Sequence, residues 1–294
     1  MSPEVSRRQV LGTIGMSLGG SAWVSALLRA GIIAENRLFK IGACDWSLHN
    51  LGRLSALDVA KEIGLDGVQV SFNRPGEGDD LRRVDVRERY LQKCEALGVE
   101  IASLAIIVLN AVPLATSDDA ERWLAECIEI MPKLGQKVVL LPFFGPADIA
   151  ESRELQQQVI VRLKRVAPLA EKAGVILGLE TWLSAEDHVR IIDAVGSAAV
   201  QVYYDVANSL SRGYDIYREI RWLGRERICE IHCKENKTLL GKGEVDFARV
   251  KEALDEIGWS GWLIIEGAIG PGMTLKDSYV ANQKFLRSLF PTKS

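Results

Sequence analysis

Short apolar runs alternate with amphipathic stretches along most of the chain. Each run is rich in β-branched or bulky apolar residues and is bounded by glycine or polar residues, a pattern typical of buried parallel strands. The runs lie near residues 39–44, 67–71, 99–105, 137–142, 175–180, 200–204, 228–233 and 262–266. Amphipathic stretches that predict helices lie near residues 55–63, 85–97, 118–134, 152–173, 184–195, 215–222, 246–257 and 275–289. The pattern therefore predicts eight strand–helix units.

Several joints between a predicted helix and the next strand share one feature. A glycine follows the last apolar part of the helix, at Gly64, Gly98, Gly135, Gly174 and Gly258. Glycine adopts the left-handed conformation that ends a helix, and the chain can then turn directly into the next strand. Eight such units over about 250 residues favour an α/β fold of the (β/α)8 TIM barrel type over a doubly wound sheet.

The beginning of the chain follows another pattern. Arg7 and Arg8 stand directly before an uncharged, glycine-rich stretch that runs to Leu28. Paired arginines before such a stretch are typical of a twin-arginine export signal. We therefore divide the chain into residues 1–37, an export signal with a short linker, and residues 38–294, the barrel domain.

This signal predicts the twin-arginine export machinery as a partner and a periplasmic location in a bacterium. Small residues at Val24-Ser25-Ala26 offer a cleavage site. The export route carries folded proteins, which agrees with a metal site that forms before export. Two alternatives stay open: a retained membrane anchor, because the stretch is roughly long enough to span a bilayer, and an N-terminal helix without a targeting role.

Composition narrows the classes of partner. The chain has 294 residues, of which 48% are hydrophobic and 26% charged, and its formal net charge is −3. This is an ordinary globular composition without the basic balance that recruits nucleic acid or anionic lipid, so a small neutral substrate fits better. The five cysteines are odd in number and show no Cys-x-x-Cys spacing, and we expect no structural disulfide.

Four polar residues end four separate apolar runs in the second half of the chain. They are Glu180, Asp205, His232 and Glu266. In a barrel of parallel strands the C-terminal strand ends meet at one mouth, which carries the active site. Two glutamates, an aspartate and a histidine there predict an oxygen-rich site for a divalent cation, with one or both glutamates also able to move protons. Alternatively, some of them are ordinary strand-end residues that cap the next helix or pair with Lys234.

A family resemblance rests on the motifs around these residues. The chain carries Glu180-Thr181, Tyr204-Asp205-Val206-Ala207-Asn208, Ile231-His232-Cys233-Lys234-Glu235, Gly241-Lys242-Gly243-Glu244-Val245-Asp246-Phe247 and Ile265-Glu266-Gly267. In this order they resemble the motifs of the xylose-isomerase-like sugar isomerase/epimerase superfamily, closest to its D-tagatose 3-epimerase-like and inosose-dehydratase-like branches. The resemblance extends from about Phe39 to the C terminus and is most specific in the second half.

The resemblance implies a ligand set and two catalytic residues. Glu180, Asp205, His232 and Glu266 would hold one divalent metal ion, commonly manganese, with cobalt, magnesium, zinc or iron as alternatives. Glu180 and Glu266 would also be the catalytic carboxylates. Barrels of this kind often pair through helical faces or loops, so a homo-oligomer stays open.

The predicted reaction is metal-dependent isomerisation or epimerisation of a sugar or keto-sugar. A cation that binds the carbonyl and adjacent hydroxyl oxygens stabilises an enediolate, and one glutamate removes a proton that the other returns to the opposite face. The alternative is a lyase or dehydratase that acts on a keto-inositol or 3-keto-glycoside, in which the same enediolate expels a leaving group. A non-catalytic sugar-binding protein stays open. An endonuclease of the same barrel type is disfavoured, because its metal cluster needs many histidines and this chain has three.

Residues at other strand ends are candidates for substrate binding. Trp46 and His49 follow the first predicted strand and could offer a stacking wall and a hydrogen bond, although both could be loop packing. Glu186, six residues after Glu180, is either a substrate contact or an exposed residue of the first helical turn. Asn208 stands three residues after Asp205, where many related epimerases have a histidine.

Three further positions affect the interpretation. Gln69 occupies a second-strand position where related proteins often have glutamate, and Thr238 stands in a region that lacks an arginine often found after the histidine motif. These departures leave metal binding intact but put the identity of the substrate in doubt. His188 lies within a predicted helix, and we expect it to face solvent.

Overall fold

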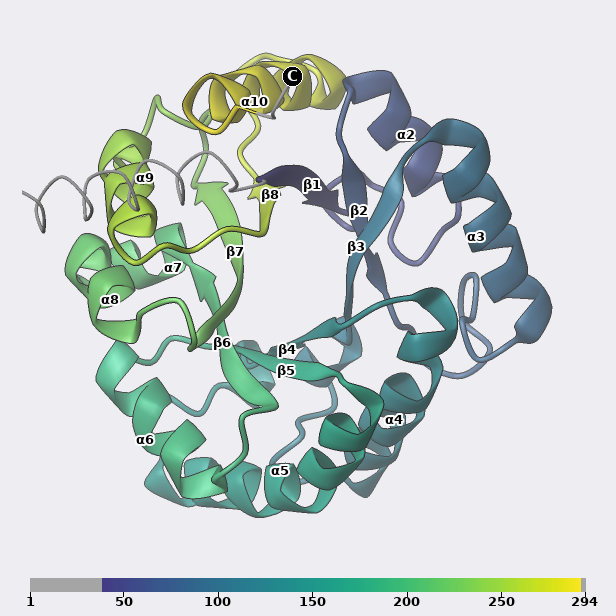
Figure 1. The fold of residues 1–294 in the computed structure, drawn as a ribbon, viewed down its shortest axis with the longest axis vertical. Coiled ribbons are helices and arrows are strands. Elements are labelled where there is room, and N and C mark those ends of the chain that lie inside the picture. The colour runs from purple at the N-terminus through teal and green to yellow at the C-terminus, as the bar shows by residue number, and fades with distance from the viewer. Residues whose placement is uncertain (1–38, 292–294) are drawn as a thin grey trace, which may run out of the picture. The chain divides into compact units, whose positions relative to one another are not determined.

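The computed structural model describes residues 39–291. Its eight parallel strands close into a barrel in chain order, with the last strand pairing with the first (Figure 1). The strands are β1 (Lys40–Cys44), β2 (Gly67–Ser71), β3 (Glu100–Ala105), β4 (Val138–Pro142), β5 (Ile176–Glu180), β6 (Val200–Asp205), β7 (Ile228–Glu235) and β8 (Trp262–Gly267). The predicted export signal, its cleavage site and the possible membrane anchor lie outside the described residues.

A ring of helices surrounds the barrel and covers its outer face (Figure 1). The helices are α2 (Ala56–Ile63), α3 (Val84–Leu97), α4 (Asp118–Ile130), α5 (Arg153–Ala173), α6 (Ala185–Val195), α7 (Val206–Ser211), α8 (Ile216–Leu223), α9 (Phe247–Glu256) and α10 (Leu275–Leu289). Short 3₁₀ turns occupy Ile107–Asn110, Met131–Leu134 and Gly145–Ala147. The predicted TIM barrel of eight strand–helix units is confirmed.

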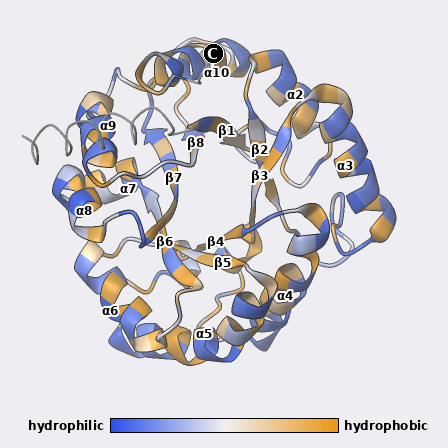
Figure 2. Ribbon diagram, viewed as in Figure 1, coloured by the Kyte–Doolittle hydropathy of each residue, from blue (hydrophilic) through white to orange (hydrophobic). Residues whose placement is uncertain are grey.

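The hydrophobic pattern explains how the two layers pack. The strands are largely apolar, with polar residues most frequent in β7, whereas helices alternate hydrophobic and hydrophilic sides (Figure 2). In α5 the buried residues Val159, Leu163, Val166 and Ala170 recur every three or four positions, which places them on one helical face. Removing this face from water, against the outer side of the sheet, is the main favourable contribution to folding.

Local signals account for the ends of the helices. Gly64 and Gly174 end α2 and α5 with φ values of 85° and 67°, the left-handed region that favours glycine. The hydroxyls of Ser152 and Ser184 accept hydrogen bonds from backbone N–H groups in the first turns of α5 and α6. The two glycine caps confirm the predicted helix-to-strand joints at Gly64 and Gly174.

The structure differs from the predicted elements in three places. The helix predicted over 118–134 ends at Ile130 and continues as a 3₁₀ turn, because Pro132 has no N–H to donate. The short helix α7 was not predicted, since six residues are too few to show helical periodicity. Strand β7 extends to Glu235 through the polar residues Lys234 and Glu235, which hid its end.

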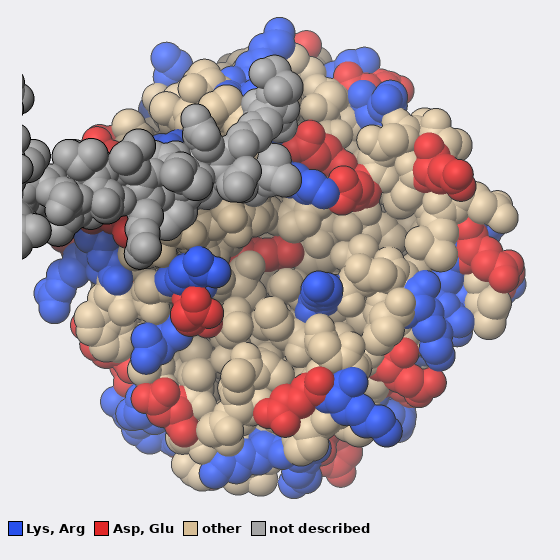
Figure 3. Space-filling model, viewed as in Figure 1, with Lys and Arg blue, Asp and Glu red and all other residues tan. Residues whose placement is uncertain are grey.

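The described residues also test what the composition predicted about disulfides and surface charge. All five cysteines are free thiols. On the face shown in Figure 3, Lys and Arg side chains lie interspersed with Asp and Glu, unlike the continuous basic surface that nucleic acids favour. Within residues 39–291 no helix is long and apolar enough to cross a membrane.

A buried carboxylate ties the loop after β1 to strand β2. Asp45 is fully buried, and its Oδ2 accepts hydrogen bonds from the N–H groups of Gly52 (2.9 Å) and Ser71 (2.7 Å). Its Oδ1 accepts a third from the Ser71 hydroxyl at 2.6 Å. The loop held in this way contains Trp46, the next residue along the chain.

We expect Asp45→Ala to lower the free energy of unfolding by about 2–4 kcal/mol, because three buried donors lose their acceptor. Asp58→Ala is a matched control: its side chain is 48% exposed and pairs with Lys93 at the surface, so the expected loss is below about 1 kcal/mol. Urea denaturation of both variants measures the difference. Equal losses would contradict the structural role of Asp45.

Candidate metal and catalytic site

Four neighbouring strands bring the predicted site residues to one mouth of the barrel. Glu180 and Asp205 are the last residues of β5 and β6, while His232 and Glu266 lie near the ends of β7 and β8. Parallel pairing sets His232 directly beside Asp205 and places Lys234 beside Glu266. The strand register therefore produces the cluster, as the predicted strand ends indicated.

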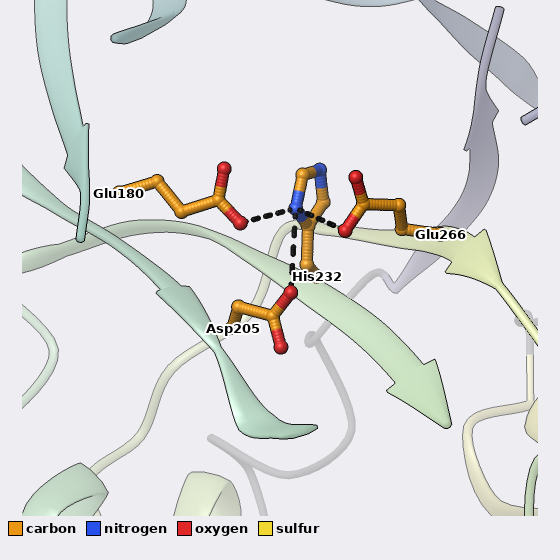
Figure 4. A group of neighbouring side chains, drawn as sticks. All are labelled: Glu180, Asp205, His232 and Glu266. Carbon is orange, nitrogen blue, oxygen red and sulfur yellow. Dashed lines mark hydrogen bonds and ion pairs between the residues drawn. The ribbon is translucent and has the colours of Figure 1, made fainter. Parts of the chain in front are cut away.

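The four side chains converge on a common centre (Figure 4). Their ligand atoms all lie within 4.8 Å of one another. Nδ1 of His232 stands 3.0 Å from Glu180 Oε1, 3.7 Å from Glu266 Oε2 and 3.9 Å from Asp205 Oδ2. Glu180 and Glu266 approach His232 from opposite sides (Figure 4).

Asp205 uses its two carboxylate oxygens differently. Oδ1 accepts hydrogen bonds from the N–H groups of Ala207 (2.9 Å) and Asn208 (2.8 Å) and so caps helix α7. Oδ2 is buried, points into the cluster and has no hydrogen-bond partner within the described part of the chain. The alternative that Asp205 caps the next helix is thus also true, and the cap leaves one oxygen for another ligand.

Two donors hold Glu266. The indole N–H of Trp46 donates to Oε1 at 3.0 Å, and the ammonium of Lys234 donates to Oε2 at 2.8 Å. The same ammonium lies 3.8 Å from Asp205 Oδ2. Lys234 therefore places a positive charge between two carboxylates of the cluster.

Burial and neighbouring charges shift the pKa values of the cluster. Burial raises the pKa of Asp205 to about 8, against the opposing effect of Lys234. Burial alone would lower the pKa of His232, but Glu180 and Glu266 raise it to about 9. Burial would raise the pKa of Glu266, yet His232 and Lys234 lower it to about 2. Without a cation, protons on both Asp205 and His232 reduce the repulsion between the crowded carboxylates.

The residues present fit a divalent cation. The donor set comprises three carboxylates and one imidazole, which suits Mn²⁺, Mg²⁺, Co²⁺, Fe²⁺ or Zn²⁺. The observation that tests the fit is Oδ2 of Asp205, which is buried and makes no hydrogen bond to the described residues, because a buried polar oxygen without a hydrogen-bond partner is costly. A cation at the centre would supply that partner. Their roles as metal ligands stay a prediction.

The structure separates the four predicted substrate-binding residues into two pairs. Trp46 and Asn208 touch the cluster: Asn208 Nδ2 lies 3.4 Å from Glu180 Oε1, and Trp46 bonds to Glu266. His49 and Glu186 are exposed, in the turn after β1 and in the first turn of α6, and neither joins the cluster. Glu186 is thus an exposed residue of the first helical turn in this structure, which is one of the two interpretations given for it above.

The expectation that His188 faces solvent is wrong. His188 is 4% exposed; its Nε2 lies 3.0 Å from the Thr181 hydroxyl and its Nδ1 lies 3.0 Å from the Ser184 carbonyl oxygen. Burial lowers its pKa to about 4, so it is neutral at pH 7. The imidazole thus links Thr181 and Ser184, two residues of the turn between β5 and α6.

Sequence reasoning missed a second group of polar residues deeper in the barrel. Gln69, Ser103, Tyr203 and Glu230 are buried on four different strands beneath the cluster. Strand alternation could have found Glu230, because it stands two residues before His232 and so shares its face. The predicted alternative that a strand-end residue pairs with Lys234 holds for Glu266. Gln69 and Ser103 are polar residues in otherwise apolar strands, a further signal of an internal network.

Comparisons with known proteins agree with this geometry. The family model described as "Xylose isomerase-like TIM barrel" matches residues 57–289. The L-ribulose-5-phosphate 3-epimerase UlaE of Escherichia coli (strain SMS-3-5 / SECEC) is 30% identical over 236 residues, covering 72% of this chain and 81% of that protein. The 2-epi-5-epi-valiolone 7-phosphate 2-epimerase of an Actinoplanes species is 26% identical over 227 residues, covering 73% and 82%.

A solved structure shows the same fold. The D-allulose 3-epimerase from Methylomonas sp., determined in complex with D-allulose, superimposes with a TM-score of 0.68 at 16% identity, over 86% of this chain and 98% of that one. The matching family model spans more than half of the chain and all four strands that carry the cluster. The chain belongs to the xylose isomerase-like TIM barrel family.

Proposed function

We propose that the protein is a divalent-cation-dependent epimerase or isomerase that acts on a keto-sugar. Family membership and the epimerases among its relatives support an enzyme of sugar chemistry. The observation that carries the proposal is the placement of two glutamates on opposite sides of one centre (Figure 4). Beside them lies an aspartate oxygen that makes no hydrogen bond to the described residues. This is the arrangement that proton removal from one face and return to the other requires.

Each residue of the cluster has a role in this proposal. Glu180, Asp205, His232 and Glu266 would hold the cation, with Mn²⁺ the metal we propose. The cation would supply the positive charge that makes a C–H beside the sugar carbonyl more acidic. Either Glu180 or Glu266 would accept the proton from that carbon, and the other would donate its own proton to the opposite face.

Neighbouring donors hold the two glutamates in place. Trp46 and Lys234 donate to the two oxygens of Glu266, and Asn208 approaches Glu180. They restrict the carboxylates to the two sides of the centre, where a substrate carbon would lie between them. His49 and Glu186 would contact the substrate only from the rim of the mouth.

We expect Glu180→Gln and Glu266→Gln each to reduce turnover at least about 100-fold, because a positioned general acid or base contributes roughly that much or more. The measurement incubates the Mn²⁺-loaded protein with a ketose panel in heavy water. The unmodified protein should incorporate one solvent deuterium into a product of unchanged formula. A glutamate variant should exchange the proton of at most one epimer, because only one face keeps its base.

Glu129→Gln is the matched control, since this glutamate is 77% exposed on α4; its turnover should stay within about twofold. Full turnover in both site variants would contradict the assigned roles. Loss of water or of an aglycone from the substrate would instead identify a lyase.

Cation affinity should rise with pH between about 6 and 8. The free site keeps protons on His232, whose pKa is raised to about 9, and on Asp205, whose pKa is raised to about 8. A cation must displace them, so affinity should increase about tenfold per pH unit for each proton released. Calorimetric titration of the chelator-treated protein with Mn²⁺ measures the cation affinity at each pH. Repeating it in buffers of different ionisation enthalpy measures the number of protons released. Affinity independent of pH, without proton release, would contradict the pKa assignments.

Export is the remaining part of the proposal and rests on Arg7, Arg8 and the stretch that follows them. We expect the full-length chain with a C-terminal tag to accumulate in the periplasm of a bacterium with the twin-arginine machinery. Replacing both arginines by lysine should hold the protein in the cytoplasm, as measured by cell fractionation. Equal periplasmic amounts of the two forms would argue against this route.

A further inference from the structure

The ring of His232 has a second nitrogen that faces away from the carboxylates. Nε2 points into the barrel and lies 3.0 Å from Oε1 of Gln69 on strand β2. An amide oxygen only accepts hydrogen bonds, so this contact needs the proton on Nε2. Nδ1, which faces Glu180, Asp205 and Glu266, then carries the lone pair in the neutral ring.

The orientation of the Gln69 amide decides this outcome. Its NH₂ group donates one hydrogen to Ser103 Oγ at 3.0 Å and the other to the Tyr203 hydroxyl at 2.9 Å. Gln69 and Ser103 are 0% exposed and Tyr203 is 1% exposed, so water cannot replace these partners. In this orientation, both N–H groups of the amide and its oxygen have hydrogen-bond partners.

The two hydroxyls cannot both reverse, because both contact the carboxyl group of Glu230. Ser103 Oγ donates to Glu230 Oε2 at 2.7 Å, and the Tyr203 hydroxyl also bonds to Glu230. Burial raises the pKa of Glu230 to about 8, and even the protonated carboxyl has one hydrogen, so it can donate to only one hydroxyl. At least one hydroxyl therefore gives its single hydrogen to Glu230 and offers a lone pair to Gln69. A reversed amide would set its oxygen against that hydroxyl oxygen and its NH₂ group against Nε2–H of His232.

We propose that Gln69 is a positioning residue that fixes His232 as the Nε2–H form, and that Ser103, Tyr203 and Glu230 fix the orientation of Gln69. The inference rests on the cation site of the proposed function and deepens it. The chain of hydrogen bonds begins at Glu230 and returns to β7 at His232, two residues further along the same strand. Strand β7 thus carries both the ligand His232 and Glu230, which helps to fix the orientation of Gln69.

Fixing the proton in advance favours cation binding. A neutral histidine with its proton on Nδ1 offers no lone pair to the centre and must first move that proton. Partners on the far side of a ligating histidine typically contribute 10- to 100-fold to metal affinity. We expect a loss of about that size when the Gln69 acceptor is removed.

Zinc binding by Gln69 variants tests the inference. Gln69→Met keeps the approximate size of the side chain but removes the acceptor, and it should weaken Zn²⁺ binding about 10- to 100-fold. Gln69→Glu keeps an acceptor oxygen toward His232 but loses both donors to Ser103 and Tyr203, so it should bind Zn²⁺ more tightly than Gln69→Met. Competition with a chelator of known affinity measures both, and thermal unfolding checks that each variant folds.

The histidines themselves offer a readout that does not depend on turnover. The chain has three, His49, His188 and His232, so ¹⁵N-histidine labelling gives few side-chain signals. In the Zn²⁺-loaded protein we expect the proton of His232 on Nε2. His188 is an internal reference of the opposite form, because its Nδ1–H donates to the Ser184 carbonyl oxygen. A proton on Nδ1 of His232 in the loaded protein would overturn the inference.

Tyr203→Phe separates the positioning role from general packing. It removes one acceptor of the Gln69 amide but keeps the ring that packs against His232, with centroids 4.6 Å apart. It should weaken Zn²⁺ binding severalfold when Gln69 is present and have no further effect in the Gln69→Met background. Equal effects in both backgrounds would overturn the inference.

The result also separates this inference from the proposed function. If the unmodified protein binds no divalent cation, the cation site itself fails. If it binds Zn²⁺ and Gln69→Met binds equally tightly, the cation site stands and only the role of Gln69 is overturned.

Discussion

The charge balance at the barrel mouth is the constraint on which the rest of the structure depends. Strands β5, β6 and β8 bring Glu180, Asp205 and Glu266 within 4.8 Å of the same imidazole. Among residues 39–291, Lys234 is the fixed positive charge that forms ion pairs with them, so three ionised carboxylates leave an excess of two negative charges around a neutral His232. Either two protons or one divalent cation cancels this excess, and the raised pKa values of Asp205 and His232 are the signature of the proton-bound form.

The fold tolerates this concentration of charge because each carboxylate is held by groups outside the cluster. Asp205 accepts hydrogen bonds from two backbone N–H groups at the start of α7, Glu266 accepts from Trp46 and Lys234, and Glu180 accepts from Asn208 at 3.4 Å. Trp46 in turn belongs to the loop that Asp45 ties to strand β2. The side chains therefore cannot swing apart to relieve their repulsion, and the position of the excess charge is set by the backbone.

The sequence predicted the barrel because its signals are local and repeated. Apolar runs, glycine joints and helical periodicity each report on a few neighbouring residues, and eight repeats leave little choice of architecture. The convergence of the strand-end residues Glu180, Asp205, His232 and Glu266 followed from that architecture. Their roles as ligands and bases stay predictions, since convergence alone does not establish them.

What the sequence could not predict depends on contacts between distant strands. Gln69 and Glu230 are separated along the chain and meet only through Ser103 and Tyr203 inside the closed barrel. His188 appeared to be a surface residue because its neighbours Glu186, Asp187 and Arg190 are charged. It is buried because the turn after β5 folds over it. In both cases the deciding partner lies on another element or in a turn whose path the sequence pattern does not specify.

The two glutamates differ in their surroundings, and this difference links the charge balance to the proposed chemistry. The Glu180 side chain is 4% exposed, whereas that of Glu266 is 17% exposed and has a donor on each oxygen. An epimerase works in both directions, so each carboxylate must accept a proton in one direction and donate one in the other. In the proton-bound form Glu266 is a weak base, because the charges of His232 and Lys234 lower its pKa to about 2. A divalent cation at the centre would replace the proton on His232 with a larger positive charge beside Glu266, so filling the site would not by itself make Glu266 a stronger base. Proton transfer at Glu266 in the proposed reaction would therefore depend on a more acidic C–H in the substrate rather than on a strongly basic carboxylate.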